Sequence, residues 1–171
     1  AHQQSKKSDE EKEREVPVLA FDYMFPKSEK SKSLGIESLP ILIGINRKLK
    51  WKSANIVPEK GANPYAAAVM SREIELAGYN RLVIKSDQEP AILSLIQMAK
   101  AERHEEIEIL PEESPVGEHQ SNGEIERNAQ TLEGQIRCML LCLESRYKSR
   151  LREDHPIMPW LVRHSATILN L

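Results

Sequence analysis

Apolar residues along the chain gather in short runs that predict β-strands. Three such runs, Val16–Phe21, Leu39–Asn46 and Trp51–Val57, follow one another before any helical pattern begins. Because no helix separates them, they predict an antiparallel meander. Two further strands are predicted over Arg81–Lys85 and Glu106–Leu110.

Between and after these strands, residue patterns predict four helices. Asn63 suits a helix N-cap and Pro64 suits the first turn. Gly78 suits the position just past the end, so this helix is predicted to run through Leu76. The other helices are predicted over Pro90 to about Arg103, about Ser121 to Lys148, and Trp160–Leu169. The order βββαβαβαα predicts an α/β fold with a mixed sheet.

The long predicted helix that starts near Ser121 has one apolar face. At about 100° per residue, its apolar side chains form a single stripe. The stripe consists of Ile125, Ala129, Leu132, Ile136, Met139, Leu140, Leu143 and Tyr147. Glu126 falls on the flank of this stripe, near the start of the helix. Ser121 and Glu124 have the spacing of a capping box, which gives Glu124 a structural role and leaves Glu126 for another.

Composition and charge bound the class of the protein. The 171 residues include 24 Lys and Arg against 26 Asp and Glu, a formal net charge of -2, which excludes a strongly basic nucleic-acid-binding domain. Residues 1–15 have no apolar anchor beyond Ala1 and predict a disordered charged linker, so the folded domain is predicted to span residues 16–171. No apolar run approaches the ~20 residues of a membrane span, so no membrane partner is expected.

The cysteines and the chain ends carry two further expectations. Cys138 and Cys142 lie about one helical turn apart, and two cysteines are too few for a disulfide framework, so reduced thiols and an intracellular location are expected. The chain starts without Met and stops inside a predicted helix. We therefore expect it to be a fragment of a longer polyprotein.

Two acidic residues stand where active sites form in α/β sheets, at the carboxyl ends of strands. Asp22 ends the first predicted strand and Asp87 follows the fourth. With Glu126, they could bind hard divalent cations through oxygen, and two such ions about 3.5–4 Å apart suit phosphoryl transfer. Each acid also has a plainer interpretation, as a strand-end residue, a turn residue and a solvated helix residue respectively, so several reaction classes stay open.

One segment of the chain resembles a motif of a known family. Residues 114–132, SPVGEHQSNGEIERNAQTL, are similar to the stretch around the third catalytic acid of retroviral and retrotransposon integrases. In that family the phrase runs approximately S-P-x-x-H-P-Q-S-N-G-x-x-E-R-x-N-x-T-L. The resemblance assigns Glu126 as the third acid. It also assigns Asp87, in the phrase IKSD, as the second acid and Asp22, in LAFD, as the first.

The resemblance covers residues 16–171 and implies a fold and an activity. The implied fold is ribonuclease H-like, with a five-stranded mixed sheet of three antiparallel and two parallel strands flanked by helices. The implied activity is that of a divalent-metal-dependent polynucleotidyl transferase and endonuclease, which trims the 3′ ends of element DNA and joins them to target DNA. Asp22, Asp87 and Glu126 would be both the catalytic residues and the ligands of two Mg²⁺ or Mn²⁺ ions.

The family resemblance also implies partners and a location. The partners would be element and target DNA, and further copies of the chain in a homodimer or higher homo-oligomer. The protein would act in the nucleus when its target is chromosomal DNA.

Polar and basic residues near the acids are the candidate DNA contacts. They comprise a predicted polar loop of His119, Gln120, Ser121 and Asn122, then Arg127 and Gln130 on the helix, and Lys27 and Lys30 after the first acid. Each basic side chain could contact phosphate and release counterions. The alternative interpretations are solvated surface groups and a simple helix-entry turn.

The sequence departs from the integrase pattern at several positions. It lacks the Pro between His119 and Gln120, and Ala129 stands where the pattern has Asn. Gln130 and Glu133 occupy positions at which retroviral members often have Lys that grips DNA. These changes weaken the expected hold of the helix on DNA and leave the three acids in place.

Two other functions fit the same residues. A degenerate or domesticated core could act as a DNA-binding or oligomerisation module without catalysis. A transposase or nuclease of the same fold could use the same acids on different DNA ends. The phrase that joins Asn122-Gly123 to Glu126-Arg127 favours a retrotransposon-type integrase.

Overall fold

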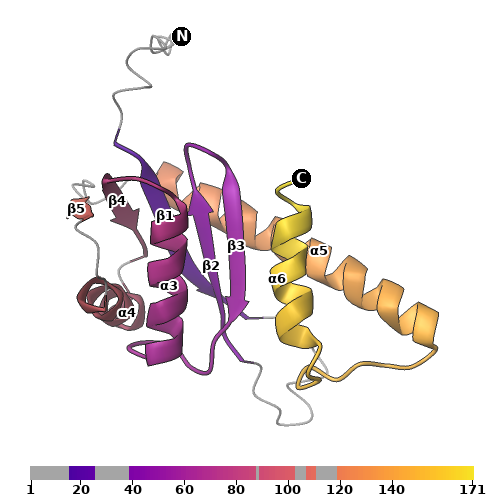
Figure 1. The fold of residues 1–171 in the computed structure, drawn as a ribbon. Coiled ribbons are helices and arrows are strands. Elements are labelled where there is room, and N and C mark those ends of the chain that lie inside the picture. Colours follow the sequence, from indigo (N-terminus) through magenta and orange to yellow (C-terminus); the bar gives the residue numbers. More distant parts are fainter. Residues whose placement is uncertain (1–15, 26–38, 88, 103–106, 111–118) are drawn as a thin grey trace, which may run out of the picture.

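A five-stranded sheet with helices on both faces forms the centre of the molecule (Figure 1). The structure is a computed structural model that describes residues 16–25, 39–87, 89–102, 107–110 and 119–171. The strand order across the sheet is β3-β2-β1-β4-β5. The predicted linker, residues 1–15, lies outside the described residues.

The strand directions are mixed, as the sequence predicts. An antiparallel meander contains β1 (Val18–Met24), β2 (Ile41–Asn46) and β3 (Trp51–Ile56). The other two strands are β4 (Arg81–Lys85), which is parallel to β1, and β5 (Glu108–Leu110), which is parallel to β4. The expected α/β class, with three antiparallel and two parallel strands, is therefore confirmed.

The end of the first strand differs from the prediction. Asp22 does not end β1, because the ladder with β2 continues through the pairs Tyr23–Leu42 and Met24–Ile41. Tyr23 and Met24 are both buried, so packing of the sheet extends the strand past the acidic residue.

Four helices complete the described part of the chain. They are α3 (Pro64–Leu76), α4 (Pro90–Ala101), α5 (His119–Tyr147) and α6 (Met158–Ile168). Asn63 caps α3 as predicted, because its side-chain oxygen accepts hydrogen bonds from the backbone N–H groups of Tyr65 and Ala66. Gly78, just past the C-cap Ala77, has a φ of +69°, which glycine adopts without strain. Among these described helices, none is long and apolar enough to cross a membrane.

The side-chain alternation along β1 divides the apolar core into two clusters, one on each face of the sheet. Leu19 and Phe21 pack in the cluster that includes α3 and α4. Ala20 and Met24 pack in the cluster that includes α5 and α6. Because side chains alternate between faces every residue, Asp22 lies on the α5 side of the sheet, with Ala20 and Met24. Figure 1 shows α3 and α5 on opposite sides of the sheet.

The buried face of α5 differs from the predicted stripe at two positions. Ile125, Leu132 and Ile136 are buried as expected. Tyr147 is 69% exposed, because the last turns of α5 extend past β3 and α6 (Figure 1). Asn128, which the stripe did not include, is only 4% exposed.

The predicted capping box at the start of α5 is wrong. The helix already begins at His119, so Ser121 lies inside it rather than at its N-cap. Glu124 has a structural role of another kind. Its carboxylate accepts a hydrogen bond from Lys50 Nζ at 2.8 Å and lies 3.2 Å from Arg47 Nε, which ties α5 to the turn between β2 and β3.

Candidate active site

Asp22 and Asp87 meet because β1 and β4 run parallel. Ala20 pairs with Lys85 in this ladder. Extending the register by two residues sets Asp22, inside β1, opposite Asp87, just past the end of β4. The carboxyl ends of neighbouring parallel strands lie at one edge of a sheet, which is where α/β proteins place their sites.

Glu126 comes from the early part of α5. Its neighbour Ile125 is buried in the same cluster as Ala20 of β1, so apolar packing holds this end of the helix against the sheet. The contacts of Glu124 with Arg47 and Lys50 also hold this end of α5 against the turn between β2 and β3. The Glu126 side chain itself is exposed, in the position expected for a residue on the flank of the buried stripe.

A single cavity of about 150 Å³ brings the three predicted acids together. Its lining consists of Ala20, Phe21, Asp22, Arg47, Lys85, Ser86, Asp87, Ile125 and Glu126. The lining therefore combines three carboxylates with two basic side chains. Four secondary-structure elements or their flanks contribute to it (β1, β2, β4 and α5), although Asp22 and Glu126 lie 104 positions apart in the sequence.

The acids do not form a compact ligand set. Within the described ranges, no group of three His, Cys, Asp or Glu side chains lies close enough together to hold a metal ion. The chemistry of the donors nevertheless fits a divalent cation, because carboxylate oxygens are the ligands that Mg²⁺ and Mn²⁺ prefer. The cavity thus carries suitable donors in an open arrangement.

The electrostatics of Asp22 also favour a cation. Burial raises the pKa of Asp22 above its ordinary value of 3.8, and the charges of Asp87 and Glu89 raise it further. The hydrogen bond from Tyr23 N–H and the charge of Lys60 lower the pKa in part. A positive ion between the carboxylates would relieve the same repulsion.

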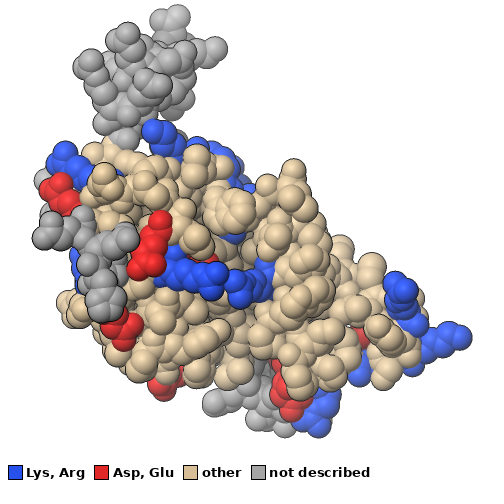
Figure 2. Space-filling view, in the orientation of Figure 1, with Lys and Arg blue, Asp and Glu red and all other residues tan. Residues whose placement is uncertain are grey.

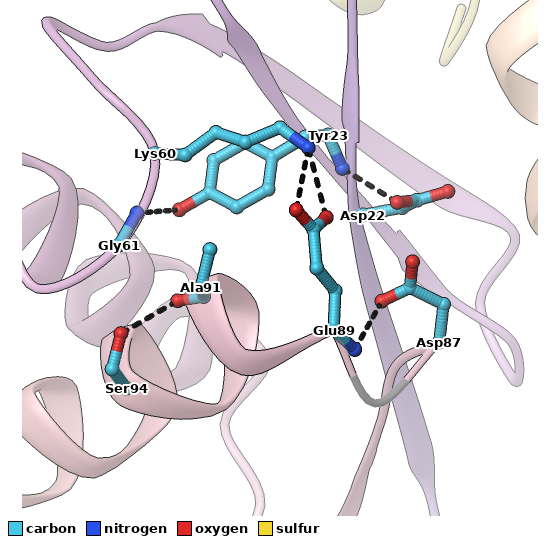
Figure 3. A network of polar contacts seen from close by, with 8 residues as sticks. All are labelled: Asp22, Tyr23, Lys60, Gly61, Asp87, Glu89, Ala91 and Ser94. Carbon is cyan, nitrogen blue, oxygen red and sulfur yellow. Dashed lines mark hydrogen bonds and ion pairs between the residues drawn. The ribbon is translucent and has the colours of Figure 1, made fainter.

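A network of polar contacts supports both aspartates (Figure 3). Tyr23 N–H donates to Asp22 Oδ1 at 2.7 Å, and Glu89 N–H donates to Asp87 Oδ1 at 3.1 Å. Lys60 Nζ donates to the two carboxylate oxygens of Glu89 at 2.9 and 2.8 Å. A backbone N–H group thus holds one oxygen of each aspartate.

The predicted DNA-contacting residues are only partly described. Arg127 and Gln130 are exposed on α5 near Glu126. The four residues predicted as a polar loop instead occupy the first helical turn of α5, and their side chains lie outside the described set: His119, Gln120, Ser121 and Asn122. The loop prediction is therefore wrong, because the helix extends two residues further toward the N-terminus than the capping pattern indicates. Lys27 and Lys30 lie outside the described residues.

Sequence reasoning did not single out four charged residues around the acids. Lys60 and Glu89 carry the network beside the aspartates, and Lys85 lines the cavity. Arg47 lines the cavity too, and the sequence offers it only as one of several basic residues in the turn after the second predicted strand, each able to contact phosphate. A signal existed for Lys85, which precedes Asp87 by two residues and therefore shares its face of β4. Lys60 and Glu89 gave no such signal, because their pairing joins two separate turns.

Charge on the visible surface is mixed. Figure 2 shows a short band of Lys and Arg across the middle of the face that carries α3, with acidic side chains close to it and large neutral areas around it. This distribution matches the near-zero formal charge of the chain. It does not form a broad basic surface on the face shown.

Comparisons with known proteins give a result at the level of structure alone. No protein-family model matches the chain. No curated protein shows significant similarity to it in sequence.

Solved structures of retroviral integrase cores are similar in fold. The HTLV-2 integrase catalytic core domain in complex with magnesium, in its trimeric form, gives a TM-score of 0.58 at 14% identity, with 89% of this chain and 83% of that chain covered. Its dimeric form gives 0.55 at 15% identity, with 90% and 87% covered. The catalytic core domain of BIV integrase gives 0.53 at 15% identity, with 89% and 82% covered. The described chain therefore has the fold of an integrase catalytic core.

Proposed function

We propose that this protein is the catalytic core of a retrotransposon-type integrase, a divalent-metal-dependent polynucleotidyl transferase that processes the 3′ ends of element DNA and joins them to target DNA. The observation that carries this proposal is the convergence of Asp22, Asp87 and Glu126 on one cavity. The similarity of the fold to HTLV-2 and BIV integrase cores supports it.

The residues of the cavity suit phosphoryl transfer. Asp22, Asp87 and Glu126 would hold Mg²⁺ or Mn²⁺, which supplies activation of the attacking oxygen and stabilisation of the leaving oxygen. Arg47 and Lys85 place positive charge on the cavity wall, where the negative charge of a phosphodiester is favoured. The backbone N–H groups of Tyr23 and Glu89 hold one oxygen of each aspartate in place. The open, partly exposed cavity admits a polymer from outside.

DNA and a second copy of the chain are the proposed partners. Arg127, exposed beside Glu126, is a candidate phosphate contact. The HTLV-2 core occurs in a dimeric and a trimeric form, which supports self-association of a chain with the same fold. The mixed surface charge indicates that the core alone would bind DNA weakly.

Substitution of each acid tests the catalytic proposal. Asp22→Asn, Asp87→Asn and Glu126→Gln should each abolish Mn²⁺-dependent joining of DNA ends, because each removes a charged oxygen donor. Glu75→Gln, which neutralises an exposed carboxylate on α3, is the matched control and should leave joining unchanged. The assay is gel analysis of labelled element-end DNA, with circular dichroism to show that each variant folds. Joining at the wild-type rate after Glu126→Gln would disprove the assignment.

A catalytically degenerate core is the second candidate, and the open arrangement of the acids favours it. Such a protein would bind DNA or further copies of itself but would not bind Mn²⁺ at the cavity. Titration calorimetry separates the two. Wild-type protein that takes up Mn²⁺, with loss of uptake in Asp22→Asn, supports the enzyme, and absence of uptake supports the degenerate module.

A further inference from the structure

We infer that Lys60, through its ion pair with Glu89, is a positioning residue that sets the placement of Asp22 and Asp87 relative to each other. This inference rests on the proposed function, since it concerns how the two aspartates of the candidate site are held. Neither residue lines the cavity, so the effect would pass through their contacts.

The pair is well fixed. Both carboxylate oxygens of Glu89 accept hydrogen bonds from Lys60 Nζ, and each side chain is only about one-third exposed. The same ammonium group lies 5.3 Å from the centroid of the Tyr23 ring and 5.4 Å from that of Phe25. Both distances are within the range of cation–π attraction. Three groups from two parts of the chain, β1 with its end and the start of α4, therefore surround the Lys60 charge.

Each end of this arrangement reaches one aspartate (Figure 3). On one side, Glu89 N–H donates to Asp87 Oδ1. On the other, Gly61 N–H, next to Lys60, donates to the Tyr23 hydroxyl at 3.1 Å, and Tyr23 N–H donates to Asp22 Oδ1. A continuous path of contacts thus runs from one aspartate to the other through the segment between β3 and α3.

The side chain of Glu89 pairs with a distant residue rather than with its own helix. Glu89 is the N-cap residue of α4, yet its side chain makes no capping hydrogen bond. The carboxylate instead turns to Lys60, which is 29 positions away in the sequence. Glu is not among the residues that favour the N-cap, so the residue type at this position suits a long-range ion pair better than a cap.

Charge gives the pairing a second effect on the site. Glu89 is near enough to Asp22 to add to the repulsion that raises the pKa of Asp22, whereas Lys60 acts in the opposite direction. Without the ammonium group, the Glu89 carboxylate would be repelled from the two aspartates. The turn that carries Glu89 N–H would then move away from Asp87, and the series of contacts that links the two aspartates would be broken.

Removal of the Lys60 charge tests the inference. Lys60→Met should weaken Mn²⁺ binding by about 10- to 100-fold, the usual effect of losing a group that orients a metal ligand. Glu89→Gln should have a similar effect. Lys100→Met, which removes an exposed charge at the far end of α4, is the matched control and should leave the affinity unchanged. Titration calorimetry measures the affinity, and thermal unfolding shows that each variant is folded.

Charge reversal separates positioning from simple loss of stability. The double variant Lys60→Glu with Glu89→Lys restores an ion pair and should recover most of the affinity that either single reversal loses. A lower melting temperature in Lys60→Met with unchanged Mn²⁺ affinity would overturn the inference and leave the proposed function standing. The same conclusion would follow if the double reversal bound Mn²⁺ no better than the single ones.

Amide hydrogen exchange distinguishes failure of the inference from failure of the proposed function. If the wild-type protein binds no Mn²⁺, the proposed function fails, and the rate of hydrogen exchange at the Glu89 amide then tests the positioning role by itself. Lys60→Met should then speed exchange at the Glu89 amide by about 10-fold, and leave the buried Leu95 of α4 unchanged, because only the turn loses its restraint. Equal exchange at Glu89 in both proteins would overturn the inference.

Discussion

At the scale of single residues, Asp22 combines two properties that both disfavour its charged form when no cation is bound. Its position on the α5 side of β1 makes it half-buried, and its carboxylate lies near other acids. A charged group in that position costs stability unless a cation or hydrogen bonds offset it. The sequence could show that Asp22 is acidic and near a strand end. It could not show its burial, which depends on residues more than 60 positions away.

The raised pKa of Asp22 predicts a pH effect on stability. Burial, followed by the charges of Asp87 and Glu89, makes the folded protein hold the proton more tightly than the unfolded chain does. The free energy of unfolding should therefore fall as pH rises from about 3.8 through the folded-state pKa. Asp22→Asn should have a higher melting temperature than the wild type at pH 7 without divalent cations, and this difference in melting temperature should shrink toward pH 3.8.

Thermal unfolding across this pH range checks the prediction. Addition of Mn²⁺ at pH 7 should reverse the order of the two proteins, since only the wild type gains binding free energy. Glu75→Gln, remote from the cavity, serves as the control. A constant difference between wild type and Asp22→Asn from pH 4 to pH 7 would contradict the assignment of the shift to this carboxyl.

At the scale of elements, local patterns predicted the strands and helices well because each pattern depends on near neighbours. The cap at Asn63, the strand of β4 and the apolar face of α5 follow directly from residue spacing. The start of α5 lies at His119, before the predicted start, and Glu124 pairs with Arg47 and Lys50. A capping pattern describes local contacts alone, so it could not show these long-range pairs. The Lys60–Glu89 ion pair could not be predicted from local patterns either, because its two residues lie 29 positions apart in the sequence.

Asn128 on α5 gives a prediction at this scale. Its side chain is 4% exposed, and within the described part of the chain neither its amide nitrogen nor its amide oxygen has a hydrogen-bond partner. A buried amide without a partner costs about 1–3 kcal/mol. Asn128→Leu has a similar branched shape and should raise the free energy of unfolding by about 1 kcal/mol. Chemical denaturation measures the change.

A surface substitution provides the comparison for Asn128. Gln97→Leu, exposed on α4, should change the free energy of unfolding by less than about 0.5 kcal/mol. A loss of stability in Asn128→Leu would show that the amide makes a favourable interaction and that the reasoning from its burial is wrong.

At the scale of the whole molecule, the sheet separates two apolar clusters, and the candidate site lies where the carboxyl ends of β1 and β4 meet. The aspartates come from the sheet, Glu126 comes from a helix on one face, and the Lys60–Glu89 pair comes from the turns that lead into the helices on the other. The cavity lining therefore needs the sheet and α5, and the ion pair proposed to position the aspartates needs the turns on the other face as well. The order of elements predicted this architecture, whereas the separation of the acids within the cavity depends on packing that no local pattern describes.

The charge of the whole molecule predicts how it binds DNA. With 24 basic and 26 acidic residues, the chain alone should bind DNA weakly, and its affinity should fall as salt rises. If Arg127 contacts a phosphate, Arg127→Ala should reduce the slope of log affinity against log salt by about 1. Fluorescence anisotropy with labelled DNA measures this slope. Lys100→Ala is the control, and an equal slope in wild type and Arg127→Ala would exclude the contact.

The length of α5 has a mechanical consequence for Glu126. The helix packs against α6 near Met139, whose sulfur lies 3.2 Å from Ser165 Oγ. From that point to Glu126 is about 20 Å along the axis, at about 1.5 Å per residue. A tilt of only about 3° about this fulcrum would displace Glu126 by about 1 Å, enough to cost about 100-fold in a reaction that depends on alignment. The part of α5 beyond Met139 is about 12 Å long, at about 1.5 Å per residue, so it is the shorter arm of a lever whose longer arm carries Glu126.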